Sequence, residues 1–107
     1  MHPNAELIQS FYAAFAKRDS AAMNACYAQD VEFNDPVFQT LRGDDARRMW
    51  RMLCARAKDL NVVARHIEAD DLEGHAHWVA TYTFTGTGNK VENRIDASFV
   101  FRDGRIV

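Results

Sequence analysis

Two histidines and one aspartate stand at positions in the sequence where their side chains could bind a metal ion or transfer a proton. His75 and His77 are separated by one residue, and Asp35 directly precedes Pro36. On an extended strand the two histidines would share one face and could bind a metal ion. No cysteine or carboxylate is clearly placed to complete a ligand set, so we predict no metal site. Asp35 before a proline suits a turn, but a carboxylate beside an apolar cavity can also act as a base. Both interpretations of Asp35 stay open at this point.

Aromatic side chains could form the wall of such a cavity. The chain contains seven Phe, three Tyr and two Trp residues. An interior of this kind suits a flat, apolar ligand that is held by a few polar groups. Most of these rings would fill the core of the protein whether or not a ligand binds. The predicted aromatic interior consists of Phe11, Phe15, Phe33, Phe38, Trp50, Trp78, Tyr82 and Phe84.

The composition argues against several classes of function. With 107 residues, the chain is long enough for one small domain with a single core. Its net charge of −2 argues against nucleic acid as a partner, because nucleic-acid-binding domains are usually basic. No Gly-rich phosphate loop, nucleophile elbow or HExxH motif occurs, and we expect no cofactor. No apolar run is long enough to span a membrane, so no membrane partner is expected.

Cys26 and Cys54 are predicted to be free, buried thiols. They lack CxxC spacing, and no secretory signal places them in an oxidising compartment. We therefore expect a cytoplasmic protein.

Helical periodicity dominates the first half of the chain. It predicts a helix over 5–17, with Asn4 as its N-cap. Asp19 is predicted to cap a short second helix that ends near Tyr27, and the two helices would form a hairpin. A third helix is predicted over 45–58.

Between the second and third helices the pattern changes. Residues 31–34 alternate in polarity and predict a short strand, which Pro36 would end. Leu41, Arg42 and Gly43 are predicted to form a loop before Asp44 caps the third helix.

The second half of the chain alternates with the period of a strand. Strands are predicted over 61–70, 75–85 and 91–102, with another beginning at 105–107, which gives an α+β fold with an antiparallel sheet. Ala97, Phe99 and Phe101 should face the helices, because a register slip would bury charged residues instead.

For the strand over 61–70 the inner face is less clear, because Val62, Ala64 and His66 share one face and Val63, Arg65 and Ile67 share the other. On the first of these faces His66 would either line the cavity as a polar group or be a structural histidine.

The order of these elements, together with three local motifs, resembles the nuclear transport factor 2-like superfamily. This superfamily includes ketosteroid isomerase, SnoaL-like polyketide cyclases and limonene epoxide hydrolase. The resemblance implies one domain over 1–107, in which a cone-shaped, curved antiparallel sheet packs on the helical hairpin and the third helix. An apolar pocket would open at one end of the cone. The motifs are Phe11-Tyr12 with Phe15, the segment 31–37 with its Asp-Pro pair, and the segment 99–107.

The resemblance also bears on catalysis. Asp35 resembles the general base of ketosteroid isomerase, but the positions of that enzyme's two oxyanion donors match Phe11 and Ala97, which cannot donate. Loss of one such donor costs about 10²–10³ in rate, so strict ketosteroid isomerase chemistry is not expected. Arg94 and Asp96 are similar to a motif of limonene epoxide hydrolase but lie on a different strand, where an ion pair on the outer face is expected.

Two functions remain open from the sequence. The first is a small-molecule-binding SnoaL-like domain that acts as an isomerase, cyclase or hydratase on a small apolar substrate, with Asp35 as general base. The alternative is a module that binds a ligand or forms a dimer without catalysis. The candidate catalytic residues are Asp35, Tyr12 and His66, and the candidate ligand-binding residues are Phe11, Phe15, Trp50, Trp78, Tyr82 and Phe99.

The resemblance implies a second copy of the chain as a partner. Members of the superfamily often form dimers through the outer face of the sheet. They usually carry a long last strand, of which this chain has only 105–107, so we expect an unpaired edge along the strand over 91–102. The residues predicted on the outer face are Thr81, Thr83, Arg94, Asp96 and Ser98.

Overall fold

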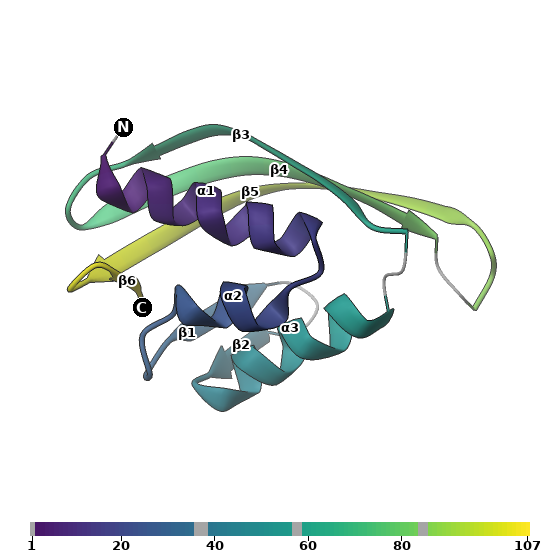
Figure 1. The fold of residues 1–107 in the computed structure, drawn as a ribbon, viewed down its shortest axis with the longest axis horizontal. Coiled ribbons are helices and arrows are strands. Elements are labelled where there is room, and N and C mark those ends of the chain that lie inside the picture. Colours follow the sequence, from purple (N-terminus) through teal and green to yellow (C-terminus); the bar gives the residue numbers. More distant parts are fainter. Residues whose placement is uncertain (1, 36–38, 57–58, 84–85) are drawn as a thin grey trace.

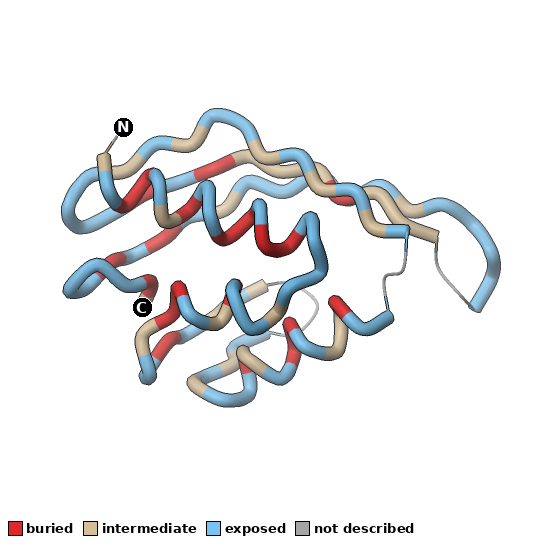
Figure 2. Tube along the Cα trace, in the orientation of Figure 1, coloured by how far each residue is buried: buried red, intermediate tan, exposed pale blue. Residues whose placement is uncertain are grey.

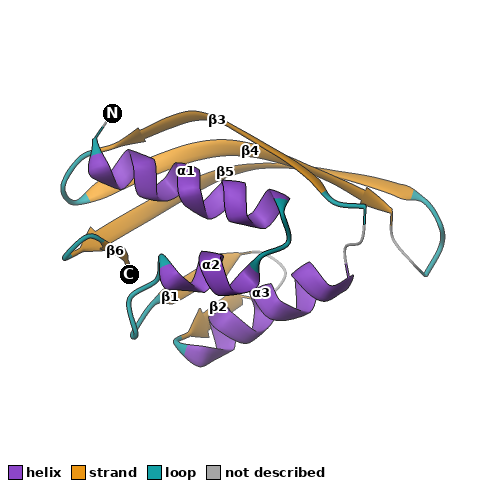
Figure 3. Ribbon diagram, in the orientation of Figure 1, coloured by secondary structure: helices purple, strands orange, loops and turns teal. Residues whose placement is uncertain are grey.

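The computed structural model describes residues 2–35, 39–56, 59–83 and 86–107. A long, curved antiparallel sheet covers helix α1, and α2, α3 and a short hairpin lie on the other side of that helix (Figures 1 and 3). The predicted α+β fold with a curved antiparallel sheet is confirmed. The elements are α1 (Pro3–Ala16), α2 (Ser20–Ala25), β1 (Glu32–Asp35), β2 (Gln39–Arg42), α3 (Asp44–Arg56), β3 (Asn61–Ala69), β4 (Glu73–Thr83), β5 (Lys90–Arg102) and β6 (Arg105–Ile106).

Helix α1 begins two residues earlier than the sequence pattern predicts. Its N-cap is His2, whose ring nitrogen accepts a hydrogen bond from the Asn4 backbone N–H at 3.0 Å. Pro3 is tolerated in the first turn because its missing N–H would have no partner there. The prediction that Asn4 caps the helix is therefore wrong. The Asn4 amide instead donates to the Asp70 carbonyl at 3.0 Å, which ties the start of α1 to the turn between β3 and β4.

The second helix has the predicted cap but is shorter than expected. The Asp19 side chain accepts a hydrogen bond from the Ala22 N–H, and the helix ends at Ala25 rather than near Tyr27. Tyr27 instead forms an isolated parallel bridge with Ile106.

The predicted loop over Leu41–Gly43 is mostly a strand. β2 pairs antiparallel with β1 in a register that sets Phe33 opposite Leu41 and Asp35 opposite Gln39. Each strand has only four residues, which is too short for a reliable alternation signal. The third helix then starts at Asp44 itself.

The main sheet has the order β3-β4-β5-β6. Its inner face carries the buried residues Ala76 and Ala80 of β4 and Phe99 and Phe101 of β5, as predicted. Figure 2 shows buried stretches along the strands of this sheet. Gly74 lies where α1 approaches β4 closely, because a Cβ atom there would be 2.9 Å from Ile8 Cδ1. The sheet and α1 thus enclose one side of the core.

A β-bulge interrupts β3 at His66. Arg65 pairs with His77 and Glu68 pairs with His75, so three steps on β3 match two steps on β4. The extra residue reverses which side chains face inward. His66 adopts φ of 54° and is exposed, whereas its predicted catalytic role would place it inside with Val62 and Ala64. That prediction is wrong because a strict period of two does not anticipate a bulge.

Several expectations fall outside the described residues. They concern the side chains of Phe38 and Phe84, the end of the third helix at 57–58 and the strand end at 84–85. Cys26 and Cys54 are free and buried, as predicted, and burial raises the pKa of both thiols. Among the described residues, no helix is long and apolar enough to cross a membrane.

Candidate ligand-binding site

Trp50 of α3 is the centre of a continuous aromatic cluster. Its ring lies 5.1 Å from the ring of Phe15, 5.5 Å from Phe11 and 5.6 Å from Phe33, measured between centroids. All three contacts are close to edge-on, a favourable geometry for aromatic pairs. The cluster therefore joins α3 to α1 and to strand β1.

The same cluster continues from α1 to the inner face of the sheet. The Trp78 ring on β4 lies 5.7 Å from both Phe15 and Tyr12, and Phe99 on β5 lies 6.2 Å from Tyr12. Five of the six predicted ligand-binding residues are thus brought together. Trp78 is only partly buried, so the cluster reaches the protein surface there.

The sixth residue, Tyr82, lies four residues beyond Trp78 on the same face of β4. Its hydroxyl accepts a hydrogen bond from the Asn93 side-chain amide at 3.4 Å. Asn93 belongs to the inner face of β5 and was missed in the sequence analysis. Strict alternation between Val91 and Ile95 would have found it.

Asp35 lies at the end of β1 and is partly buried. Side chains two residues apart on a strand point to the same side, so Asp35 shares a face with Phe33. Since Phe33 contacts Trp50, this face of β1 is the one that meets the aromatic cluster. Residues 36–38, which follow Asp35 in the chain, lie outside the described residues.

Two tyrosine hydroxyls are held in the interior. Tyr27 Oη accepts a hydrogen bond from Trp50 Nε1 at 2.7 Å, a contact that no local pattern in the sequence predicts. The Tyr12 side chain is 5% exposed, and its hydroxyl makes no hydrogen bond to any described residue. Burial raises the pKa of both hydroxyls, so each keeps its proton at neutral pH. Among the described residues, then, the Tyr12 hydroxyl has no hydrogen-bond acceptor, and its ring lies next to Trp78 and Phe99.

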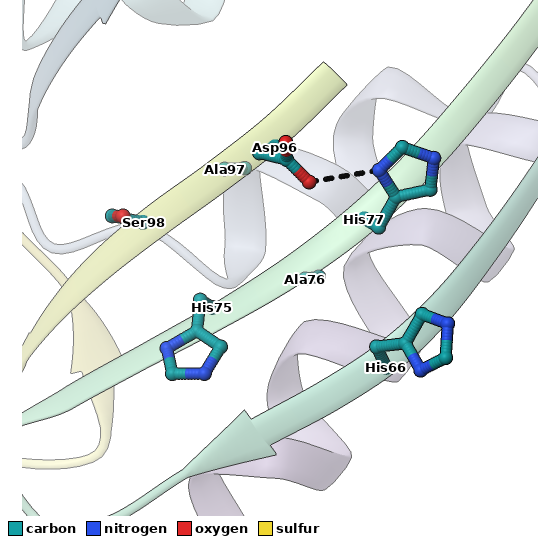
Figure 4. A pocket seen from close by; sticks show the side chains of 7 residues that line it. All are labelled: His66, His75, Ala76, His77, Asp96, Ala97 and Ser98. Carbon is teal, nitrogen blue, oxygen red and sulfur yellow. Dashed lines mark hydrogen bonds and ion pairs between the residues drawn. The ribbon is translucent and has the colours of Figure 1, made fainter. Parts of the chain in front are cut away.

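His66 does not join this group, because the bulge places it on the outer face of the sheet. It lines a shallow hollow of about 500 Å³ with His75, His77, Asp96 and Ser98 (Figure 4). His77 Nδ1 lies 2.8 Å from Asp96 Oδ1. No cluster of three or more metal-ligating side chains occurs among the described residues, even around these histidines.

A second hollow of about 360 Å³ lies where α1, α2 and α3 meet. It is lined by basic side chains, including Lys17, Arg18 and Arg51. Asp35 is in the lining of neither hollow. The predicted apolar pocket is therefore not outlined by either of them, and the aromatic rings themselves pack most of the described interior.

Phe11 and Ala97, the two positions at which the resemblance predicts that oxyanion donors are absent, lie in the same region. Phe11 turns its ring toward Trp50 and Tyr27, and Ala97 lies on the inner face of β5. Neither side chain can donate a hydrogen bond. Asp96, the acidic neighbour of Ala97, points to the outer face instead.

The fold is similar to the folds of several solved structures. The structure resembles an NTF2-like protein of unknown function from Burkholderia pseudomallei, with 18% identity and a TM-score of 0.84 over 99% of this chain and 86% of that one. It also resembles TerC co-crystallised with polyporic acid, with 20% identity and a TM-score of 0.81 over 97% of this chain and 85% of that one.

A third structure has a higher sequence identity. A protein from Xanthomonas campestris pv. campestris that is assigned as a polyketide cyclase shares 25% identity, with a TM-score of 0.76 over 97% of this chain and 84% of that one. A search of curated proteins finds no match. The sequence profile of the SnoaL-like domain matches residues 8–107, and the chain therefore belongs to the SnoaL-like domain family.

Proposed function

We propose that this protein binds a small, flat, apolar molecule between α1, α3 and the inner face of the sheet, and that Asp35 accepts a proton from it. The observation that carries the proposal is the chain of ring contacts from Phe33 through Trp50 to Trp78. Through these contacts, the face of β1 that carries Asp35 meets an aromatic surface, and this surface is partly exposed to solvent at Trp78.

The chemistry follows from this placement. A carboxylate at the edge of an apolar surface can accept a proton from a ligand that binds there. An acidic C–H group of a ligand that stacks on the rings would supply the proton, and the Tyr12 hydroxyl would donate to a ligand oxygen. The ligand class agrees with the polyketide cyclase assignment of one structural neighbour and the polyporic acid bound to another.

The test uses 2-tetralone, a flat ketone with exchangeable C–H groups beside its carbonyl. In D₂O the protein should speed deuterium incorporation at these carbons, as followed by NMR. Asp35→Asn should abolish the acceleration while 2-tetralone still binds. Glu32→Gln is the matched control, because Glu32 lies on the same strand but is exposed and paired with Arg42. Equal exchange with Asp35→Asn and with the unmodified protein would remove Asp35 from the reaction.

A non-catalytic role is the second candidate function. It is favoured by the two positions, Phe11 and Ala97, at which oxyanion donors are absent. In that case 2-tetralone would raise the melting temperature without any exchange of its C–H groups. His66, a candidate for catalysis from the sequence, has no part in either proposal because it lies on the outer face.

We also propose that two copies associate through the outer face of the main sheet. This face carries charged and polar side chains on three adjacent strands, including Arg65, His77 and Asp96 in one row. Arg65 and Asp96 lie at opposite ends of the row. A two-fold axis near His77 would therefore set each charge against its opposite on the second copy. Light scattering at micromolar concentration should give twice the chain mass, and a monomeric mass would refute the dimer.

A further inference from the structure

The turn between α1 and α2 holds a cationic residue, Arg18, in the left-handed backbone region. The Arg18 N–H donates to the Phe15 carbonyl at 2.9 Å, and the Asp19 N–H donates to the Ala14 carbonyl at 2.9 Å. Glycine is the usual residue at the position of Arg18 in this helix-ending motif, because glycine adopts a positive φ without steric cost. Arg18 has φ of 57°. The chain therefore has a long cationic side chain at a point where glycine would form the same turn with less strain.

Arg18 is one of three cations that line the hollow of about 360 Å³ between α1, α2 and α3, which we call the basic hollow. The other two cations are Lys17, the C-cap of α1, and Arg51 of α3. Ser20 adds a hydroxyl to the lining, and the buried Cys54 adds a thiol. Figure 1 shows the turn between α1 and α2 close to α3, so the fold brings cations from two distant parts of the sequence together.

The cations of the basic hollow have no counter-charge among the described residues. None of the three takes part in an ion pair with a described residue, and Asp19, which follows Arg18, accepts a hydrogen bond from the Ala22 N–H instead. Like charges that gather without a counter-charge repel one another and destabilise the folded state. Five other arginines each form an ion pair with a carboxylate, namely Arg42, Arg47, Arg48, Arg94 and Arg102.

The helix dipole of α1 does not account for all three cations. A cation near the C-terminus of a helix is stabilised by the partial negative charge of the last carbonyls, which applies to Lys17 and Arg18. The last carbonyls of α1 already accept hydrogen bonds from the backbone N–H groups of the turn. Arg51 lies in the middle of α3, and the cation in the last turn of that helix is Arg56. The meeting of Arg51 with the other two cations therefore needs another explanation.

We propose that the basic hollow binds the phosphate group of a small phosphorylated molecule. A phosphate monoester carries a charge of about −1.5 to −2 at pH 7, so three cations match it better than they match a single carboxylate. The planar fork of an arginine can donate to two phosphate oxygens at once, and a lysine adds a compact charge. The volume of about 360 Å³ lies in the range of roughly 300–1,000 Å³ for small-molecule sites, so a diphosphate also fits.

The remaining groups of the hollow are compatible with an anion. Burial raises the pKa of the Cys54 thiol above its ordinary value, so it is uncharged at neutral pH and does not repel a phosphate. The Ser20 hydroxyl can donate a hydrogen bond to a phosphate oxygen. A long polyanion such as nucleic acid is not the expected ligand, because the chain as a whole has a net charge of −2. Because Arg18 and Arg51 come from different elements, a bound phosphate would link the turn after α1 to α3.

The test is an NMR titration of the backbone amides with sodium pyrophosphate, with sodium chloride at the same ionic strength as the reference. We expect pyrophosphate to shift the amides of 17–20 and of Arg51, and sodium chloride to have no comparable effect. Arg18→Gly and Arg51→Gln should each weaken pyrophosphate binding by roughly tenfold or more, because each removes a charge-assisted hydrogen bond. Arg48→Gln is the matched control, since Arg48 lies on the same helix but is paired with Asp45, and it should change the affinity by less than about twofold.

The Arg18→Gly variant also separates binding from folding. Because glycine adopts the backbone conformation of Arg18 without strain, this variant should melt at or above the temperature of the unmodified protein while it binds pyrophosphate more weakly. A lower melting temperature would show that Arg18 serves the fold itself, and it would overturn the proposal.

Three further results would overturn the proposal. The first is a response to pyrophosphate no larger than the response to sodium chloride. The second is an equal loss of affinity in Arg48→Gln and Arg51→Gln, which would indicate a diffuse charge effect and no defined site. The third is sedimentation of the protein with vesicles that contain phosphatidic acid but no response to pyrophosphate, which would assign the cations to a membrane surface. None of these results bears on Asp35 or on the aromatic cluster, so the two proposals are tested separately.

Discussion

Tyr12 and Tyr27 are both buried, yet the structure predicts opposite consequences when each loses its hydroxyl. In Tyr27→Phe, the indole N–H of Trp50 loses its acceptor at 2.7 Å and stays buried. Leaving a buried donor without a partner costs about 1–3 kcal/mol. In Tyr12→Phe no hydrogen bond to a described residue is lost, so the free energy of unfolding should change by less than about 0.5 kcal/mol.

The two variants are compared with the unmodified protein in two assays, urea unfolding and thermal melting. In a domain near this size, Tyr27→Phe should lower the melting temperature by roughly 4–8 °C for each kcal/mol lost, while Tyr12→Phe should leave it nearly unchanged. Equal destabilisation by the two substitutions would refute the claim that the Tyr12 hydroxyl has no hydrogen-bond acceptor among the described residues.

Ligand binding provides the other half of the test. If Tyr12 donates to a ligand oxygen, Tyr12→Phe should weaken binding of 2-naphthol by about three- to tenfold, the effect of one hydrogen bond. Binding of 2-methylnaphthalene, which has the same ring system without the hydroxyl, should be unaffected. The same loss for both compounds would show that the substitution perturbs packing instead.

Two further predictions concern stability. Gly74→Ala should destabilise the fold by about 1–3 kcal/mol in urea unfolding, because the new Cβ would lie 2.9 Å from Ile8 Cδ1 and from the Glu68 carbonyl oxygen; an unchanged midpoint would contradict the close approach of α1 to β4. Hydrogen bonds from the Glu73 and Leu72 N–H groups lower the pKa of Asp70 in the folded state. The ionised carboxylate therefore stabilises the fold at any pH above its unfolded pKa of about 3.9. This stabilisation is lost as the pH falls through the lower pKa that Asp70 has in the folded state. Asp70→Ala should therefore lower the melting temperature at pH 7, with a gap that narrows below about pH 4; a gap that is constant with pH would show that the charge of Asp70 has no part.

Much of the fold follows from local patterns in the sequence. The helical spacing near Phe11 and Phe15 and the alternation around Phe99 and Phe101 reflect burial on one face, which tertiary packing reinforces. At two places where the structure departs from these patterns, a single residue is responsible. His2 displaces Asn4 as the cap of α1, and the extra residue at His66 moves an imidazole from the inner face to the outer face.

The candidate site was harder to predict than the fold. The aromatic walls were predicted because large rings are rarely left in water, and five of them do meet around Trp50 and Tyr12. The hydrogen bond between Tyr27 and Trp50 joins residues 23 positions apart, and no local pattern encodes such a distance. The same holds for the basic hollow, whose cations come from the end of α1 and from α3.

The central claim is that an apolar ligand binds against the aromatic cluster that meets the Asp35 face of β1. The most direct measurement is the set of NMR nuclear Overhauser contacts between bound 2-naphthol and the indole protons of the chain, since both of its tryptophans, Trp50 and Trp78, belong to that cluster. The account predicts contacts from the ligand ring to Trp78 and to Phe33 or Trp50. Contacts confined to His75 and His77 on the outer face, or none to either indole, would contradict it.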